Sequence, residues 1–246
     1  MPASLAFLFL AFSSVFLPTS SAAAEERDLS LSICYNYQVE PPPVSRPDAP
    51  SVPKCRVIGH TMFIDGGIFP DEYAFELTAH YPEVTTLQLN SDGGAVKNLY
   101  PLTDLIRARG IHTHVRKGAS CSSACTMLYI AGTRRTAHPG ARFMIHAIHN
   151  GGRPIRIDDL CERSGAMDKC GKALIEIVDD QRQSTKEMFE KYVSYGASPN
   201  LWRDYLRLPK DDKWYEHGNF TQRIDWVMGA EEAREQGFVQ EITENP

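Results

Sequence analysis

The sequence predicts an α/β protein with a largely parallel sheet. Short β-branched segments such as Val84–Ser91 are typical of strands, whereas Ala95–Gly110 has apolar residues at helical spacing. Segments of these two kinds alternate along the chain from Arg56 onwards. Because strands separated by helices favour right-handed crossovers between parallel strands, this alternation predicts a largely parallel sheet covered by helices.

The first four elements follow from local signals. Residues 56–67 are expected to form one strand that ends at a Gly-Gly pair. Pro70-Asp71 is favourable chemistry for a helix start, and Pro82 stops that helix. The β-branched residues of 84–91 then predict a second strand, and a Gly-Gly turn leads into a helix that stops at Gly110.

The second half of the chain continues this alternation. Residues 111–118 are expected as a strand, 123–132 as a helix too apolar to face water, and 141–150 as a further strand. Residues 172–196 predict one long helix. Residues 229–242 predict a short helix, a glycine turn and a last strand.

The start of the chain predicts a secretory signal. Residues 1–24 contain no charged side chain, and an apolar stretch from Leu5 to Leu17 precedes the small residues of Ser21–Ala24. This pattern is typical of a signal peptide, so an exported protein, periplasmic or secreted, is expected. An uncleaved anchor is the alternative, although the apolar stretch is short for a bilayer. No later segment is long and apolar enough to cross a membrane, so no stable span is expected after cleavage.

Residues 25–55 are expected to form a Pro-rich segment before the main domain, 56–246. The stretch Pro41–Pro53 cannot pair in a central strand and favours an extended, polyproline-like path. Six cysteines, an even number in a chain expected to be exported, predict disulfides, and pairing of nearest neighbours along the chain is the simplest arrangement. The expected pairs are Cys34–Cys55, Cys121–Cys125 and Cys161–Cys170. Zinc is the alternative, but no paired C-x-x-C supports it.

Charge excludes one class of partner. The formal net charge is −5, and no block of basic residues is present, so nucleic acid is not expected as a partner. His112 and His114 share one face of a predicted strand and could hold a metal, but no third ligand lies nearby in the sequence. No metal and no cofactor are therefore expected.

Two strand-to-helix junctions carry candidate chemistry. One turns at Gly93-Gly94, and the other begins a helix near Ser123. Each helix start leaves backbone N–H groups unsatisfied, and in a parallel sheet such ends share the edge where ligands bind. Two converging starts would suit an oxygen that becomes negative during acyl transfer. A serine at the second junction would lie beside that pocket. Helix capping is its alternative role.

A nucleophilic serine also needs a base. His146 lies in the strand that follows the serine helix, and it shares a face of that strand with Met144 and Ile148. Packing in the core is the commoner role of a single histidine in such a place. The residues alone therefore leave both roles open.

Four segments, in order, resemble the ClpP/crotonase superfamily, specifically the proteolytic subunit of the Clp protease and its exported relatives among the signal peptide peptidase-like serine proteases. NSDGG resembles the oxyanion loop N-S-P-G-G, and SACTMLYIAG the nucleophile helix S-M-G-x-x-L-L-x-A-G. HPGARFMIH resembles L-P-N-S-R-x-M-I-H, and GAEEAREQGFVQEI the closing S-A-x-E-A-x-x-Y-G-L-V-D-x-I. The resemblance covers about Arg56 to Ile242 and implies a spiral of β-β-α units with a largely parallel sheet.

The resemblance also implies roles for single residues. Ser123 would attack a peptide or ester carbonyl, and His146 would take its proton and return it to the leaving group. Backbone N–H groups of Gly93-Gly94 and Ala124 would hold the oxyanion. Ser122 is the alternative nucleophile, although the spacing to the helix end favours Ser123. A disulfide between the flanking cysteines would clamp the backbone around the serine. A cysteine nucleophile is the less favoured alternative.

The acid of a triad is where the sequence departs most from the family pattern. Counting back from GAEEA puts the acid position at Thr221, which cannot orient an imidazolium as a carboxylate does. Asp225 lies nearby and is the candidate acid, with Asp211 and Asp212 as alternatives. A Ser/His dyad or no catalysis is also open. Asp92 replaces the proline of the oxyanion loop, where its carboxylate could oppose an oxyanion or cap the following helix.

The sequence therefore predicts an exported serine peptidase-like hydrolase that cleaves a peptide or protein. The alternative is a catalytically inactive relative that uses the same cleft to bind a peptide or protein partner. A third reading, an acyl thioester as substrate, lacks any sign of a coenzyme A site. The resemblance also implies a homo-oligomer, because the family usually forms rings with its long helix, here 172–196, at subunit contacts.

Overall fold

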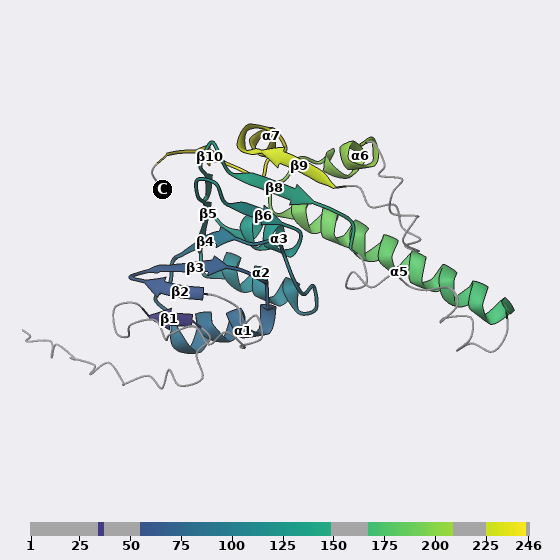
Figure 1. The fold of residues 1–246 in the computed structure, drawn as a ribbon, viewed down its shortest axis with the longest axis horizontal. Helices are drawn as coiled ribbons and strands as arrows, with labels where there is room; N and C mark the ends of the chain where they lie inside the picture. Colours follow the sequence, from purple (N-terminus) through teal and green to yellow (C-terminus); the bar gives the residue numbers. More distant parts are fainter. Residues whose placement is uncertain (1–33, 37–54, 149–166, 209–224, 245–246) are drawn as a thin grey trace, which may run out of the picture.

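The structure is a computed structural model that describes residues 34–36, 55–148, 167–208 and 225–244 (Figure 1). Several predictions concern positions outside these ranges: the signal peptide 1–24, Pro41–Pro53, Cys161, Asp211, Asp212 and Thr221. The pair Cys161–Cys170 therefore stays a prediction. No helix within the described ranges has the length and apolar character that a membrane span requires.

Two sheets organise the described residues. The larger has the strand order β1 (Cys34–Asn36), β2 (Cys55–Ile58), β3 (Thr61–Asp65), β4 (Thr86–Asn90), β5 (His112–Val115), β7 (Arg135–Ala137) and β10 (Glu241–Ile242). All its neighbours pair in parallel except β2 with β3. The smaller sheet has β8 (Arg142–Ile145) between β6 (Ser120–Ser122), which is parallel to it, and β9 (Trp226–Gly229), which is antiparallel. The predicted α/β class with a largely parallel sheet is confirmed.

Helices cover and connect these sheets (Figure 1). They are α1 (Pro70–Phe75), which continues into a π-helical turn, η1 (Glu76–His80), then α2 (Leu99–Ala108), α3 (Ala124–Ala131), α5 (Met167–Ser194), α6 (Leu201–Leu206) and α7 (Ala230–Glu235). The predicted helices at 70–82, 95–110, 123–132 and 172–196 are present with shifted ends, and so are the short helix and the last strand expected within 229–242.

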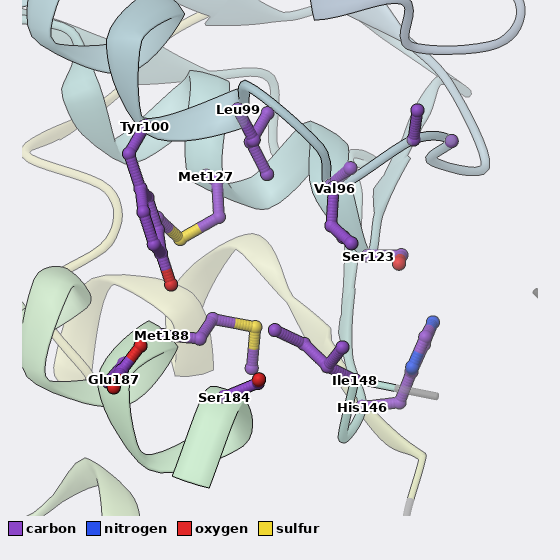
Figure 2. Close-up of a pocket in the computed structure, with 13 residues that line it drawn as sticks. Val96, Leu99, Tyr100, Ser123, Met127, His146, Ile148, Ser184, Glu187 and Met188 are labelled. Carbon is purple, nitrogen blue, oxygen red and sulfur yellow. The ribbon is translucent and has the colours of Figure 1, made fainter. Parts of the chain in front are cut away.

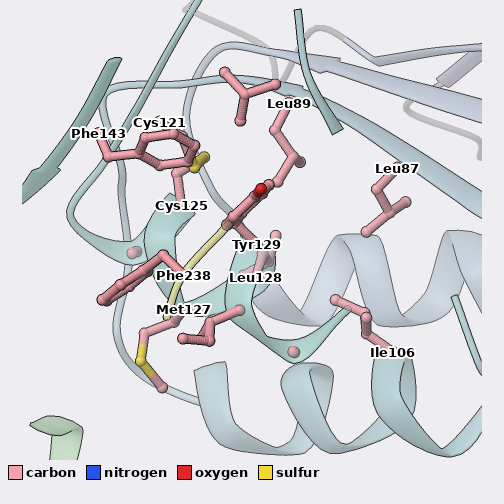
Figure 3. Packing of buried hydrophobic residues seen from close by; sticks show 14 of the residues in the cluster. Leu87, Leu89, Ile106, Cys121, Cys125, Met127, Leu128, Tyr129, Phe143 and Phe238 are labelled. Atoms are coloured by element: carbon pink, nitrogen blue, oxygen red, sulfur yellow. A yellow bond between two sulfur atoms is a disulfide. The ribbon is translucent and has the colours of Figure 1, made fainter. Parts of the chain in front are cut away.

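The core is built around α3. All of its residues are buried, and it contacts strands of both sheets as well as α2. Figure 3 shows Tyr129 and Leu128 of this helix among Leu87 of β4, Phe143 of β8 and Ile106 of α2. Burial on all sides explains why its sequence carries no polar face, as predicted.

The prediction of one strand over 56–67 is wrong. Residues 55–65 form a hairpin of β2 and β3, which pair antiparallel. Gly59 between them has φ +57°, a left-handed conformation that glycine adopts without steric cost and that reverses the chain. The short strands β6, β7 and β9 and helix α6 were not expected from the sequence.

Part of the predicted Pro-rich segment belongs to the larger sheet. β1 pairs in parallel with β2, and Cys34 lies opposite Cys55 in this register. The two cysteines form a disulfide with their Cα atoms 4.5 Å apart, as predicted. The disulfide therefore fastens the edge strand to the sheet. The domain boundary at residue 56 itself stays a prediction.

His114 is a buried titratable group in the centre of this fold. Only 3% of it is exposed, and its Nδ1 lies 2.8 Å from Oγ1 of Thr136. Burial, and to a lesser extent the nearby His138, lower the pKa of His114 from 6.5 to about 4. Because the unfolded chain takes up this proton near pH 6.5 and the folded chain only near pH 4, the contribution of neutral His114 to stability is complete above pH 6.5 and is lost as the pH falls toward 4.

We expect the free energy of unfolding of the wild type to fall between pH 6.5 and 4 by on the order of 3 kcal/mol more than that of His114→Gln. Urea titrations at several pH values measure this difference. His112→Gln is the matched control, because His112 is exposed on the same strand and should keep the wild-type pH dependence. Equal pH dependence in wild type and His114→Gln would contradict the prediction.

Candidate active site

Ser123 occupies a sharp turn between a strand and a helix. β6 ends at Ser122 and α3 begins at Ala124, and Ser123 between them has φ 55° and ψ −125°. A positive φ is uncommon for a residue with a side chain and costs of order 1–3 kcal/mol. Such a conformation persists only where the surrounding structure holds it in place. Backbone geometry therefore distinguishes Ser123 from the other serines in the described part of the chain.

Three hydrogen bonds hold the backbone of Ser123. Its N–H donates to the carbonyl of Met144 in β8 at 2.8 Å. Its carbonyl accepts from the N–H of Thr126 at 2.9 Å and from Oγ1 of Thr126 at 2.6 Å. The Ser123 hydroxyl makes no capping bond to α3, although the residue stands at the N-cap position. The hydroxyl instead lines a cavity.

A disulfide closes over this turn. Cys121 in β6 and Cys125 in the first turn of α3 are bonded, with Cα atoms 5.2 Å apart, which confirms the predicted pair. Both cysteines are fully buried (Figure 3). The bond joins the residues on either side of Ser123 and so limits how the strand and the helix can move apart.

The glycine loop lies directly against Ser123. Gly93 has φ +105°, and a Cβ built on it would lie 2.6 Å from Cβ of Ser123. The loop is held by Ile68, whose N–H donates to the carbonyl of Gly93 at 2.9 Å and whose carbonyl accepts from Ala95 at 2.9 Å. A Cβ on Gly94 would collide with the backbone of Ile68. Both glycines are therefore required by close approach of the backbone.

Two backbone donors are available near the serine. Among the described residues, neither the N–H of Gly94 nor that of Ala124 has an acceptor. Both residues line the same cavity as Ser123. Asp92, whose carboxylate could oppose an oxyanion, is exposed and does not line this cavity. Its Oδ1 lies 3.4 Å from Oγ of Ser120. The negative charge is therefore turned toward β6.

His146 follows the end of β8 and also lines the cavity. Figure 2 shows its imidazole directed toward the side of the cavity where the Ser123 hydroxyl lies. Nδ1 lies 2.7 Å from the carbonyl oxygen of Ala147. Because a carbonyl can only accept, Nδ1 carries the hydrogen in this arrangement and Nε2 carries the lone pair. That tautomer is the one a general base needs.

Strand register places Asp225 beside His146. β8 and β9 are antiparallel, with Ile145 opposite Trp226. His146 directly follows β8 and Asp225 directly precedes β9, so both residues lie at the same end of this strand pair. Asp225 is exposed. The counted acid position, Thr221, lies outside the described residues, whereas Asp225 is at the strand end that adjoins His146.

The cavity that these residues share has a volume of about 300 Å³ (Figure 2). Its walls beyond Ser123 and His146 are mostly apolar and come from α2, α3, α5 and the end of β8. The remaining lining residues among those described are Ala95, Val96, Leu99, Tyr100, Met127, Ile148, Ser184, Glu187 and Met188. Ser122, the alternative nucleophile, is buried in β6 and does not line it.

Two side chains that sequence reasoning missed hold the segment after His146. The N–H of Ala147 donates to the phenol oxygen of Tyr205 in α6 at 2.8 Å. The N–H of Ile148 donates to Oγ1 of Thr185 in α5 at 3.1 Å. Both partners are remote in sequence, and no local pattern marks them.

The described residues contain no group of three or more His, Cys, Asp or Glu arranged to hold a metal ion. The two histidines of β5 also differ, since His112 is exposed and His114 is buried against Thr136. Burial of His114 therefore keeps it from binding a ligand together with His112.

An α/β fold whose strand ends bring a serine, a histidine and a glycine loop to one cavity is typical of a hydrolase. The family model described as Clp protease matches residues 77–246 of this 246-residue chain. The chain therefore belongs to the Clp protease family, which supports a function of the peptidase type. The resemblance predicted from the four motifs is confirmed at this level. No curated protein gives a significant match to the chain.

Removal of the Cys121–Cys125 disulfide should affect the local turn at Ser123 more than the stability of the whole fold. We expect Cys121→Ala/Cys125→Ala to lose about 2 kcal/mol of unfolding free energy, because the closed loop is short. The amide of Ser123, which is bonded to Met144, should exchange with deuterium at least about tenfold faster in this variant. Hydrogen exchange followed by NMR or mass spectrometry measures both effects.

The matched control is Cys34→Ala/Cys55→Ala, which opens a longer loop at the far edge of the sheet. It should lose more stability, about 3 kcal/mol, yet leave exchange at Ser123 unchanged under conditions where the protein stays folded. Equal acceleration at Ser123 in both variants would show that the nearer disulfide has no local effect.

Proposed function

We propose that this protein is a serine peptidase in which Ser123 is the nucleophile, His146 the general base and Asp225 the acid that orients it. The observation that carries the proposal is the conformation of Ser123. Its backbone is held at a positive φ. Its hydroxyl makes no capping bond to the helix, and the residue lines a cavity together with His146. A serine needed only to cap a helix would not require that backbone.

In the proposed reaction, Oγ of Ser123 attacks the peptide carbonyl while Nε2 of His146 takes the hydroxyl proton. The N–H groups of Gly94 and Ala124 donate to the oxyanion that forms. Collapse of this intermediate breaks the C–N bond, and the imidazolium returns its proton to the leaving amine. Water then attacks the acyl-enzyme by the same steps and releases the acid and the serine.

The backbone donors beside the glycine loop should raise the reaction rate by stabilising the oxyanion. Removal of a single oxyanion donor typically costs about 10²- to 10³-fold in rate. The donors here belong to the backbone and are positioned by Ile68 and by the start of α3, so they need little reorganisation as charge develops. Because Asp92 is turned toward Ser120, its carboxylate does not occupy this site.

The second candidate function is a catalytically inactive protein that binds a peptide in the same cavity. One observation favours it: Nδ1 of His146 is held by a backbone carbonyl, that of Ala147. A carbonyl fixes the tautomer but stabilises an imidazolium less than a carboxylate does. If this bond persists during turnover, proton transfer from Ser123 is weak.

A fluorophosphonate probe tests the peptidase proposal. We expect covalent labelling of the folded protein at Ser123, located by mass spectrometry, and none in Ser123→Ala. His146→Ala should slow labelling by at least about 10²-fold. Asp225→Asn should slow it by about 10²- to 10⁴-fold, because the imidazolium loses its counter-charge.

Ser122→Ala and Asp179→Asn are matched controls, the first beside the nucleophile in β6 and the second an exposed carboxylate on α5. Both should label at the wild-type rate. Absence of labelling in the folded wild-type protein would favour the inactive peptide-binding relative. If Asp225→Asn is labelled as fast as the wild type, the site is a Ser/His dyad to which Asp225 does not contribute.

We also propose that the chain is exported and, from its family membership alone, that it assembles into a homo-oligomer. Two disulfides among the described residues support export, because structural disulfides persist in oxidising compartments. We expect the protein recovered from its native source to begin after residue 23 or 24, as N-terminal sequencing would measure. A native protein that retains Met1 would contradict the proposal of signal cleavage.

A further inference from the structure

The cavity beside Ser123 differs chemically at its two ends. Figure 2 shows Met127 and Met188 between Ser123 on one side and Glu187 on the other. The phenol oxygen of Tyr100 lies on the same side as the Glu187 carboxylate. The cavity is therefore apolar along the two methionines, and its far end carries the oxygen atoms of Tyr100 and Glu187.

Glu187 is exposed on α5, and its hydrogen-bond partner is neutral. Its Oε1 accepts from the side-chain amide of Gln183 at 2.8 Å, which is neutral. The cation one turn further along α5, Lys191, donates instead to Oδ1 of Asp104 at 2.7 Å. None of the ion pairs among the described residues involves Glu187.

The negative charge of Glu187 acts on Tyr100, another residue that lines the cavity. Burial raises the pKa of the Tyr100 phenol above its ordinary value, the Glu187 charge raises it further, and the ammonium of Lys191, 5.9 Å from the ring centroid, opposes this shift in part. The phenol therefore stays protonated and, together with the carboxylate, presents acceptor oxygens to whatever enters. Ser184 adds a hydroxyl to the lining.

We infer that, if the peptidase function proposed above holds, this cavity selects a substrate side chain with an apolar stem and a positively charged end, lysine or arginine, and that Glu187 sets this specificity. The stem would lie along the two methionines, whose flexible thioethers adapt to irregular shapes. The ammonium or guanidinium would reach the carboxylate and form charge-assisted hydrogen bonds. A purely apolar side chain would contact the walls and bring no cation to Glu187.

Two peptides that differ only at this side chain provide the test. One carries lysine and the other norleucine, which has the same stem without the amine, on the acyl side of the scissile bond. The wild type should prefer lysine, and Glu187→Gln should lower the ratio of the two kcat/KM values by about tenfold. Glu187→Lys should reverse the preference, so that the norleucine peptide is used better than the lysine peptide.

Binding to Ser123→Ala separates this inference from the proposed function. Ser123→Ala retains the cavity, so it should bind the lysine peptide more tightly than the norleucine peptide, measured by calorimetry or fluorescence anisotropy. Ser123→Ala/Glu187→Gln should lose that preference. Discrimination in binding without hydrolysis by the wild type would overturn the peptidase proposal and retain the role of Glu187.

Glu190→Gln is the matched control. Glu190 is exposed on the same helix, pairs with Lys186 at 3.6 Å and does not line the cavity, so the lysine preference should survive its substitution. Equal use and equal binding of the two peptides by the wild-type cavity would overturn the inference. A loss of preference in Glu190→Gln as large as in Glu187→Gln would also overturn it, because the effect would then be one of general surface charge.

Discussion

Every feature of the site depends on the backbone turn at Ser123. The residue holds a conformation that a side chain disfavours, so its neighbours must hold it there. A hydrogen bond to Met144 in β8, two from Thr126 in α3 and the disulfide across the turn do so from three directions. The same turn ends the strand, starts the buried helix and leaves the helix N-terminus facing the cavity. The same turn thus positions the Ser123 hydroxyl and also exposes the backbone donors.

The glycine loop satisfies a second constraint that comes from the first. Gly93 packs against the Cβ of Ser123, and Gly94 packs against the backbone of Ile68, so neither position has room for a side chain. Close approach of this kind brings a peptide N–H group near the serine hydroxyl without any side-chain entropy to lose. It also explains why a carboxylate is tolerated next to the loop, since Asp92 is the residue free to turn outward toward Ser120.

The sequence predicted the parts of the site that local chemistry determines. The glycine turn and the serine junction are strand-to-helix transitions with their own signals, and two of the three expected disulfides lie in described residues and are formed. Strands β6, β7 and β9 have three or four residues each, too few for a periodic pattern, and were missed. The place of Asp225 depends on the register between β8 and β9, which counting along the chain toward Thr221 could not reveal.

Helix α5 connects both halves of the site, which no pattern within its own sequence indicates. The single hydroxyl hydrogen of Thr126 goes to the carbonyl of Ser123, so the hydroxyl of Tyr192, 2.6 Å away, must be the donor to Thr126. Burial raises the pKa of the Tyr192 phenol, which keeps that hydrogen in place. One face of α5 thus supports the serine turn through Tyr192, the segment after His146 through Thr185, and the cavity wall through Met188. Because a helix moves as a rigid element, a tilt of α5 would displace nucleophile, base and specificity pocket together.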